Sequence, residues 1–256
     1  MTVARTATTA TALTEYVLGL GDDALILAQR LAEWVTCAPQ IEEDIALANI
    51  SLDLLGQART LLGYGGEIEG AGRDEDDLAF LRDEHEFRNV QLVEIPNGDF
   101  AVTIARQLVF SAYQYELYRA LVDSADATLA GLAAKAVKEV AYHRDHARQW
   151  TLRLGDGTAE SHARMQASAE RVWPYAAELF EVNPAVGNLV GVAVDPVALR
   201  TDWSAFVEQV LAQATLTVPQ PSWRAHGGRR GIHTEHLGHL LPEMQYLHRA
   251  HPGASW

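Results

Sequence analysis

Two imidazoles and one carboxylate lie close together along one segment of the sequence. Glu139 precedes His143 by four residues, and His146 follows three residues after it. On a helix these separations place the three side chains on one face, and both groups are common metal ligands. A zinc site needs three or four ligands, and no other helical segment carries a matching cluster. We therefore expect a buried polar network in which Glu139 hydrogen-bonds His143, with His146 near the surface.

The alternative hypothesis is a mononuclear metal-binding protein or metalloenzyme that uses Glu139, His143 and His146. A carboxylate-bridged di-iron site has a different requirement, because it needs Glu-x-x-His on two helices of a bundle and lone glutamates on the other two. No histidine of this chain has a glutamate or an aspartate three residues before it. The spacing therefore argues against a self-standing di-iron centre of that type.

A second histidine cluster lies near the C-terminus. His236 and His239 share a helix face, as do Glu235 and His239. A metal site is one interpretation, but Thr234 as a helix cap with Glu235 in the first turn accounts for half of the pattern. We favour an interface helix, with Glu235 and His236 as partner contacts.

The segment before this cluster carries the main local concentration of positive charge. Arg224, Arg229 and Arg230 lie there within seven residues, next to glycines. Such a loop could contact a phosphate-bearing ligand or an acidic partner subunit. A solvated loop without a ligand is an equally good interpretation of the same residues.

Other catalytic patterns find little support. The segment from Gly19 to Ala24 matches G-x-G-x-x-A, but no strand precedes it, and two aspartates would repel a pyrophosphate. Cys37 lies at a helix end with no histidine nearby in the sequence, which gives little support to a cysteine nucleophile. No G-x-S-x-G or P-loop motif occurs. We expect no catalytic residue in this chain.

The elements that must position these groups are helices. Thr14 is a plausible cap for a first helix to about Cys37, and residues 1–12, rich in threonine and alanine, are expected to form a flexible arm. Four of the predicted helices have roughly 20 residues or more, as in a helical bundle. A short strand is considered at 189–194, and Pro174 should break a helix. The later helices are expected at 41–63, 78–81, 99–124, 127–154, 161–180, 197–214 and 233–250.

One apolar face is especially regular in the helix that follows Pro39. Its members are spaced by four, three, four and three residues, which is the period of an amphipathic helix. They are Ile41, Ile45, Ala48, Leu52 and Leu55.

Composition narrows the function classes. The 256 residues include 34 acidic and 20 basic side chains, a formal charge of −14, so nucleic-acid binding is not expected. No apolar run approaches the roughly 20 residues of a membrane-spanning helix. A single cysteine cannot form an internal disulfide, which agrees with a reducing cytoplasm.

Several segments together resemble one family, the C subunits of phenylacetyl-CoA epoxidase complexes. The similarity extends from about Leu13 to Trp256, and its most distinctive stretches are Asp44 to Arg59, Leu92 to Gly98, Lys138 to His143, Leu154 to Thr158 and His233 to Gly238. The resemblance implies an all-α, ferritin-like bundle of long antiparallel helices with extra C-terminal helices, in a single domain over 13–256.

The resemblance also identifies the positions at which the sister A subunit binds its two irons. That sister chain has Glu-x-x-His beside an Asp and a Gly, which match Asp53 and Gly56 here. The ligand positions themselves become Leu54 and Gln57 on this helix, and Val140 and His143 on the helix that carries the first cluster. One imidazole cannot hold two irons, so the resemblance implies that no metal or other cofactor is bound by this chain.

The implied function is that of a non-catalytic structural subunit. It would bind and position the di-iron A subunit, pair with itself, and work with further small and reductase subunits to form the 1,2-epoxide of phenylacetyl-CoA. The implied location is the cytoplasm, with neither nucleic acid nor membrane as a partner. A helical adaptor unrelated to oxygenases is a weaker third hypothesis.

Overall fold

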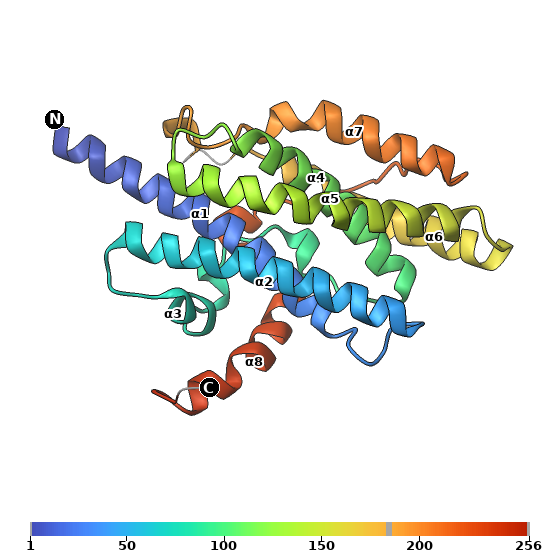
Figure 1. Cartoon of the computed structure of the whole chain (residues 1–256), viewed down its shortest axis with the longest axis horizontal. Helices are drawn as coiled ribbons and strands as arrows, with labels where there is room; N and C mark the ends of the chain where they lie inside the picture. The colour runs from blue at the N-terminus through green and yellow to red at the C-terminus, as the bar shows by residue number, and fades with distance from the viewer. Residues whose placement is uncertain (1, 183–185, 255–256) are drawn as a thin grey trace.

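The computed structural model of the chain, which describes residues 2–182 and 186–254, has four long helices at its centre (Figure 1). The helix α1 runs antiparallel to α2 beside it, and α4 and α5 form a second antiparallel pair. No strand occurs in the described ranges, which confirms the all-α prediction. The four helices are α1 (Thr2–Ala32), α2 (Ile41–Glu69), α4 (Phe100–Leu121) and α5 (Ala127–Gly155).

Shorter elements surround this bundle. The helices α6 and α7 pack on α4 and α5, whereas α3 and α8 lie at the other side, near α2 and the 82–98 loop. The helices are α3 (Glu75–Phe80), α6 (Ala159–Val172), α7 (Pro196–Gln213) and α8 (Glu235–Ala250). The 3-10 turns are η1 (Glu84–Glu86), η2 (Gln91–Val93), η3 (Trp173–Phe180), η4 (Val186–Asn188) and η5 (Gly228–Arg230).

Local sequence signals explain most helix boundaries. Asp99 accepts a hydrogen bond from the amide of Val102 and caps α4, as predicted. Asp126 caps α5 in the same way. The last residue of α5, Gly155, lies against the backbone of Ala214 at the end of α7, and a Cβ there would overlap that backbone. The expected break at Pro174 is present, because α6 ends at Val172 and a 3-10 turn follows.

The start of α1 differs from the prediction. The helix begins at Thr2 and continues through Thr14, whose hydroxyl donates to the carbonyl of Ala10 within the helix instead of capping it. Alanine is the strongest helix former, so the segment before Thr14 can extend the helix. Ala12 belongs to the buried core. The mobility of residues 1–12 stays a prediction, and Met1 lies outside the described residues.

The strand considered at 189–194 is wrong. These residues form a turn in which Gly191 adopts a positive φ of 76°. The turn packs on the connection between α4 and α5, where the amide of Ala125 donates to Gly191 O and the hydroxyl of Ser124 donates to Val192 O. Leu189 is therefore buried in a contact between two loops, and not in a β-sheet.

The regular apolar face predicted for α2 is not the one that enters the core. The core side of α2 carries Leu47, Ile50 and Leu54, which are completely buried, whereas Leu52 and Ile45 of the predicted face are exposed. The helix α2 packs against α1, α3 and α5 with its core side. The period of the pattern was correct, but α2 has two apolar faces, and the period cannot tell which one is covered.

None of the helices in the described part of the chain combines the length and the hydropathy that crossing a bilayer requires.

Candidate functional site

The four positions matched to metal ligands lie together between α2 and α5. Leu54 and Val140 are completely buried, and His143 and Gln57 are almost so. The facing helices are joined by two polar contacts at this level. The Nε2 atom of His143 lies 3.0 Å from Asp53 Oδ2, and Gln57 Nε2 donates to Glu139 Oε2 over 3.1 Å. The structure therefore brings the predicted positions to one site inside the bundle.

The predicted network exists, but its pairing is different. Glu139 does not bond His143; it accepts from Gln57 and forms an ion pair with Lys135 at 3.2 Å. The hydroxyl of Tyr118 on α4 donates to Gln57 Oε1 over 3.1 Å and extends the network to a third helix. The pairing differs from the prediction because α2 packs against α5. Glu139 and His143 therefore each find a partner on α2 and do not bond each other along α5.

His146 was expected near the surface, and this is wrong. Its Nε2 atom lies 2.7 Å from Glu43 Oε2, and both side chains are more than nine-tenths buried. Glu43 lies in the first turn of α2, so this pair ties the beginning of α2 to α5. Glu139, His143 and His146 thus have three separate partners and do not converge on one point.

The residues do not fit the di-iron group that occurs in some ferritin-like bundles. Leu54 and Val140 are hydrocarbon side chains without lone pairs, and the amide of Gln57 is already bonded to Tyr118 and Glu139. His143 faces Asp53. Within residues 2–182 and 186–254, no three His, Cys, Asp or Glu side chains are arranged to hold a metal ion.

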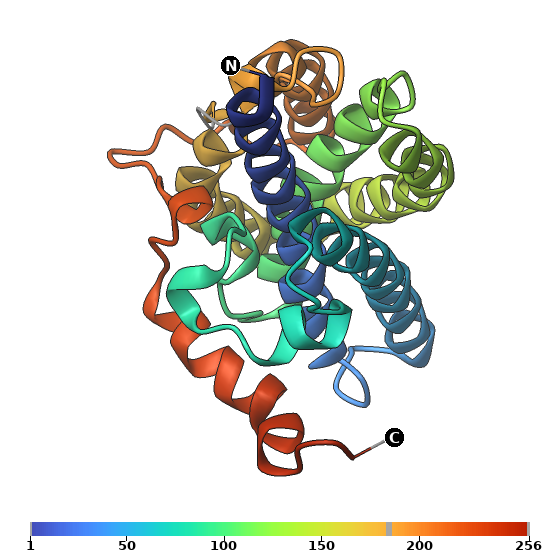
Figure 2. The ribbon, with the colours of Figure 1, turned by 90° about the vertical axis from the view of Figure 1, so that its left-hand side faces the viewer.

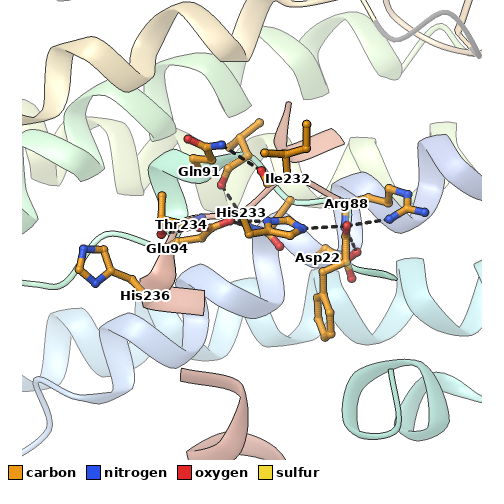
Figure 3. Close-up of polar contacts among 12 residues, drawn as sticks. Asp22, Arg88, Gln91, Glu94, Ile232, His233, Thr234 and His236 are labelled. Atoms are coloured by element: carbon orange, nitrogen blue, oxygen red, sulfur yellow. Dashed lines mark hydrogen bonds and ion pairs between the residues drawn. The ribbon is translucent and has the colours of Figure 1, made fainter. Parts of the chain in front are cut away.

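A second polar network is buried where the loops before α4 and α8 meet α1 (Figure 3). Its centre is the carboxylate of Glu94, which is fully buried. It accepts from His233 Nδ1 at 2.6 Å, from the amide and hydroxyl of Thr234 at 2.8 and 2.7 Å, and from Asn89 Nδ2 at 2.9 Å. This carboxylate joins the loop before α8 to the loop before α4.

The surroundings of His233 favour its charged form. Its Nε2 atom lies 3.0 Å from the carbonyl oxygen of Phe87, and its Nδ1 atom faces Glu94. Both ring nitrogens therefore face acceptors, which an imidazolium satisfies with two N–H donors. Burial opposes the charge, but the Glu94 carboxylate and the Phe87 carbonyl hold the pKa of His233 above its ordinary value.

Two adjacent aspartates of α1 anchor these loops. Asp22 pairs with Arg82, with Nη1 at 3.0 Å from Oδ2, and accepts the amide of Arg88. Asp23 accepts the amide of Val90 and pairs with Arg229 at 2.6 Å. These acids belong to the G-x-G-x-x-A match, which therefore serves internal anchoring. The sequence pattern did not single them out as anchors, although two charges inside the otherwise apolar stretch 16–28 were the available signal.

Of the residues predicted to contact a partner, one is directed into the protein and the others lie at or near the surface. Arg229 turns inward, since besides Asp23 it donates to the carbonyls of Gly19 and Arg88; a surface role for it is not supported, because a nearby carboxylate attracts its guanidinium. Arg224, Arg230 and Glu235 are exposed and His236 is half-buried, lying apart from the Glu94 network in Figure 3. Their contact with a partner or with coenzyme A stays a prediction.

Comparisons with known proteins agree with this architecture. The chain is 51% identical over 247 residues to the C subunit of 1,2-phenylacetyl-CoA epoxidase from Escherichia coli (strain K12), covering 95% of this chain and 99% of that protein. Its fold is similar to a solved structure described as protein 19 with aldehyde deformylating oxidase activity from Synechococcus. The TM-score is 0.58 at 18% identity, over 83% of this chain and 93% of the other.

That similarity supports the fold alone, which is the ferritin-like bundle predicted for this chain. A family model described as phenylacetic acid catabolic protein matches residues 2–256. With this match and the 51% identity to an epoxidase subunit, the chain belongs to the family of phenylacetic acid catabolic proteins.

Proposed function

We propose that this chain is a non-catalytic structural subunit of a phenylacetyl-CoA ring 1,2-epoxidase. It binds the catalytic A subunit, which holds the di-iron centre, and positions it within the complex. The support is the similarity to the C subunit of the E. coli epoxidase over nearly the whole length of both chains, together with the chemistry of the former ligand positions.

The observation that carries the proposal is the pair of buried hydrocarbon side chains at Leu54 and Val140. In a di-iron bundle the corresponding glutamates bridge or bind the metals. Here the space is filled by apolar packing, and the remaining polar groups pair with one another across the helix interface. A chain with this interior serves as a structural partner that binds the A subunit, and the A subunit activates oxygen.

The proposal includes further assignments. This chain holds no cofactor, pairs with itself, and works in the cytoplasm with the small and reductase subunits. Arg224, Arg230, Glu235 and His236 are proposed as contacts to a partner or to coenzyme A, because they remain at the surface.

The test is to purify this chain alone and together with the A subunit, and to measure iron and epoxide formation. The chain alone is expected to hold far less than one iron and to show no turnover. The two chains should co-elute and should form epoxide once the small and reductase subunits and an electron donor are added. About two irons per isolated chain, the content of a complete di-iron bundle, would contradict the proposal.

The control is His143→Ala. This variant removes the imidazole on which any metal site of this chain would depend. Because the proposal places the iron in the A subunit, the iron content of the co-purified complex should not change. A loss of iron in this variant would favour the mononuclear metal-binding alternative.

A further inference from the structure

The outer side of α2 carries a row of exposed apolar side chains. Ile41 is 71% exposed, Ile45 58%, Leu52 63% and Leu55 46%. Their separations of four, seven and three residues place them on one side of the helix, opposite the buried residues Leu47, Ile50 and Leu54. We call these four residues the α2 stripe.

Such a stripe is unusual for a helix at the surface of a soluble monomer. Single exposed apolar residues are normal, but a row that follows one side of a helix over roughly 20 Å is typical of a surface that is covered in an assembly. A helix that is apolar on both sides is normally buried on both. Figure 2 shows α2 at the periphery of the bundle with α1 on its inner side.

A glycine in the same stripe points to close packing from outside. Gly56 lies inside α2 and is exposed, and a Cβ added to it would meet no atom of this chain within 4 Å. Glycine is unfavourable inside a helix, and nothing in the described chain requires one here. A glycine that leaves a notch between Leu52 and the next turn lets another helix approach closely.

The charges beside the stripe indicate what covers it. Glu42 is exposed, Asp44 is half-buried and Asp53 is partly exposed, and all three are acidic. Arg59 is the single basic residue of α2, and it is already paired with Glu75 at 3.0 Å. A second copy of the chain would bring acidic borders together, and like charges facing one another oppose association.

We propose that the α2 stripe docks an unlike helical subunit, through an apolar helix face bordered by lysine or arginine. This inference rests on the proposed function, because that function supplies an unlike helical subunit. A stable interface buries about 800 Å² on each partner, more than four side chains provide. The proposal therefore also includes Tyr142 on α5 and Val35 before α2, which are exposed.

The test uses Leu52→Asp and Ile45→Asp in the full chain, mixed with the A subunit, with affinity measured by isothermal titration calorimetry. Each is expected to weaken binding at least tenfold and to leave the melting temperature of the isolated chain nearly unchanged, since both side chains are exposed. The matched control is Val197→Asp on α7, which is also 50% exposed and should change the affinity less than twofold.

A second variant, Gly56→Gln, should move two quantities in opposite directions. It favours the helix, and its Cβ meets no atom of the chain within 4 Å, so the isolated chain should melt a few degrees higher. It fills the notch, so the affinity for the A subunit should fall at least tenfold.

Glu42→Lys should slow association several-fold at low salt, and this difference should shrink as salt is added.

The outcomes separate the inference from the proposed function. If the unvaried chain binds the A subunit and the stripe variants bind equally well, the inference is wrong and the proposed function stands. If the unvaried chain does not bind the A subunit, the inference about the α2 stripe and the proposed function are both wrong. If Leu52→Asp abolishes self-association but leaves binding to the A subunit intact, the stripe is covered by a second copy, which overturns the inference.

Discussion

Glu178 is a carboxyl group buried on η3, between the loops that precede α4 and α8. Its oxygens accept the backbone amides of Gln91 at 2.7 Å and Gly228 at 2.6 Å. Burial raises the pKa of Glu178 to about 7, and the two amides oppose this rise only in part. Just below neutral pH, Glu178 is therefore protonated in the folded protein and ionised in the unfolded chain.

The sign of the resulting pH dependence follows from linkage. Between about pH 4.5 and 7, folded Glu178 keeps a proton that the unfolded chain releases, so this group makes the free energy of unfolding fall as the pH rises. Melting temperatures measured from pH 4.5 to 7.5 should show this fall, and Glu178→Gln should flatten it. An identical pH profile in the variant and the unvaried chain would rule out this role for Glu178.

Among the elements, α8 lies at the edge of the molecule. It extends away from the bundle in Figure 1. Its contacts include those of Gln245, whose side chain donates to the carbonyls of Ala79 and Arg82, and its N-terminal end is held through His233 and Thr234 by Glu94. The N-terminal end of α8 therefore depends on one buried carboxylate, whereas Gln245 holds the second half of the helix.

Replacing this carboxylate should release the element without unfolding the bundle. In Glu94→Ala, four donors lose their acceptor and the charge of His233 loses its partner, a loss of about 3–5 kcal/mol for a buried pair. Hydrogen exchange measured by mass spectrometry should accelerate in residues 226–250 and much less in α4 and α5. Glu235→Ala, which removes an exposed acid of the same helix, is the control. Equal acceleration throughout the chain would contradict this local role.

In the molecule as a whole, the buried apolar residues form one continuous cluster. It includes residues from α1 at one end of the sequence to α8 at the other, so no part of the described chain has a core of its own. The single domain over 13–256 stays a prediction, and the continuous cluster makes cooperative unfolding the expected behaviour.

A calorimetric scan tests that expectation. The isolated chain should unfold in a single transition, with a calorimetric enthalpy equal to the van't Hoff enthalpy and close to roughly 180 kcal/mol near 60 °C for a chain of this length. A repeat scan after cooling shows whether unfolding is reversible. Two resolved transitions would mean that residues 13–256 contain more than one cooperative unit.

Local features made much of this fold predictable. Aspartates at positions 99 and 126 cap helices because a capping bond joins residues two or three apart. Pro174 breaks a helix for an equally local reason. The errors have non-local or competing causes: Thr14 lies inside a helix that alanines extend, and the 189–194 segment is held by contacts with Ser124 and Ala125.

The amino-acid sequence alone was enough for the helical class, the family and the loss of the iron ligands. The helical class and the missing Glu-x-x-His spacing can be read from residue types and from separations of three or four along the chain, whereas the family and its ligand positions rest on the resemblance of several motifs to known proteins. The partners of the polar groups inside the bundle needed the tertiary structure, because Asp53 meets His143 across 90 residues and Asp22 meets Arg82 across 60. The same holds for α2, whose two apolar faces have similar patterns; only packing against α1 and α5 decides which one stays outside.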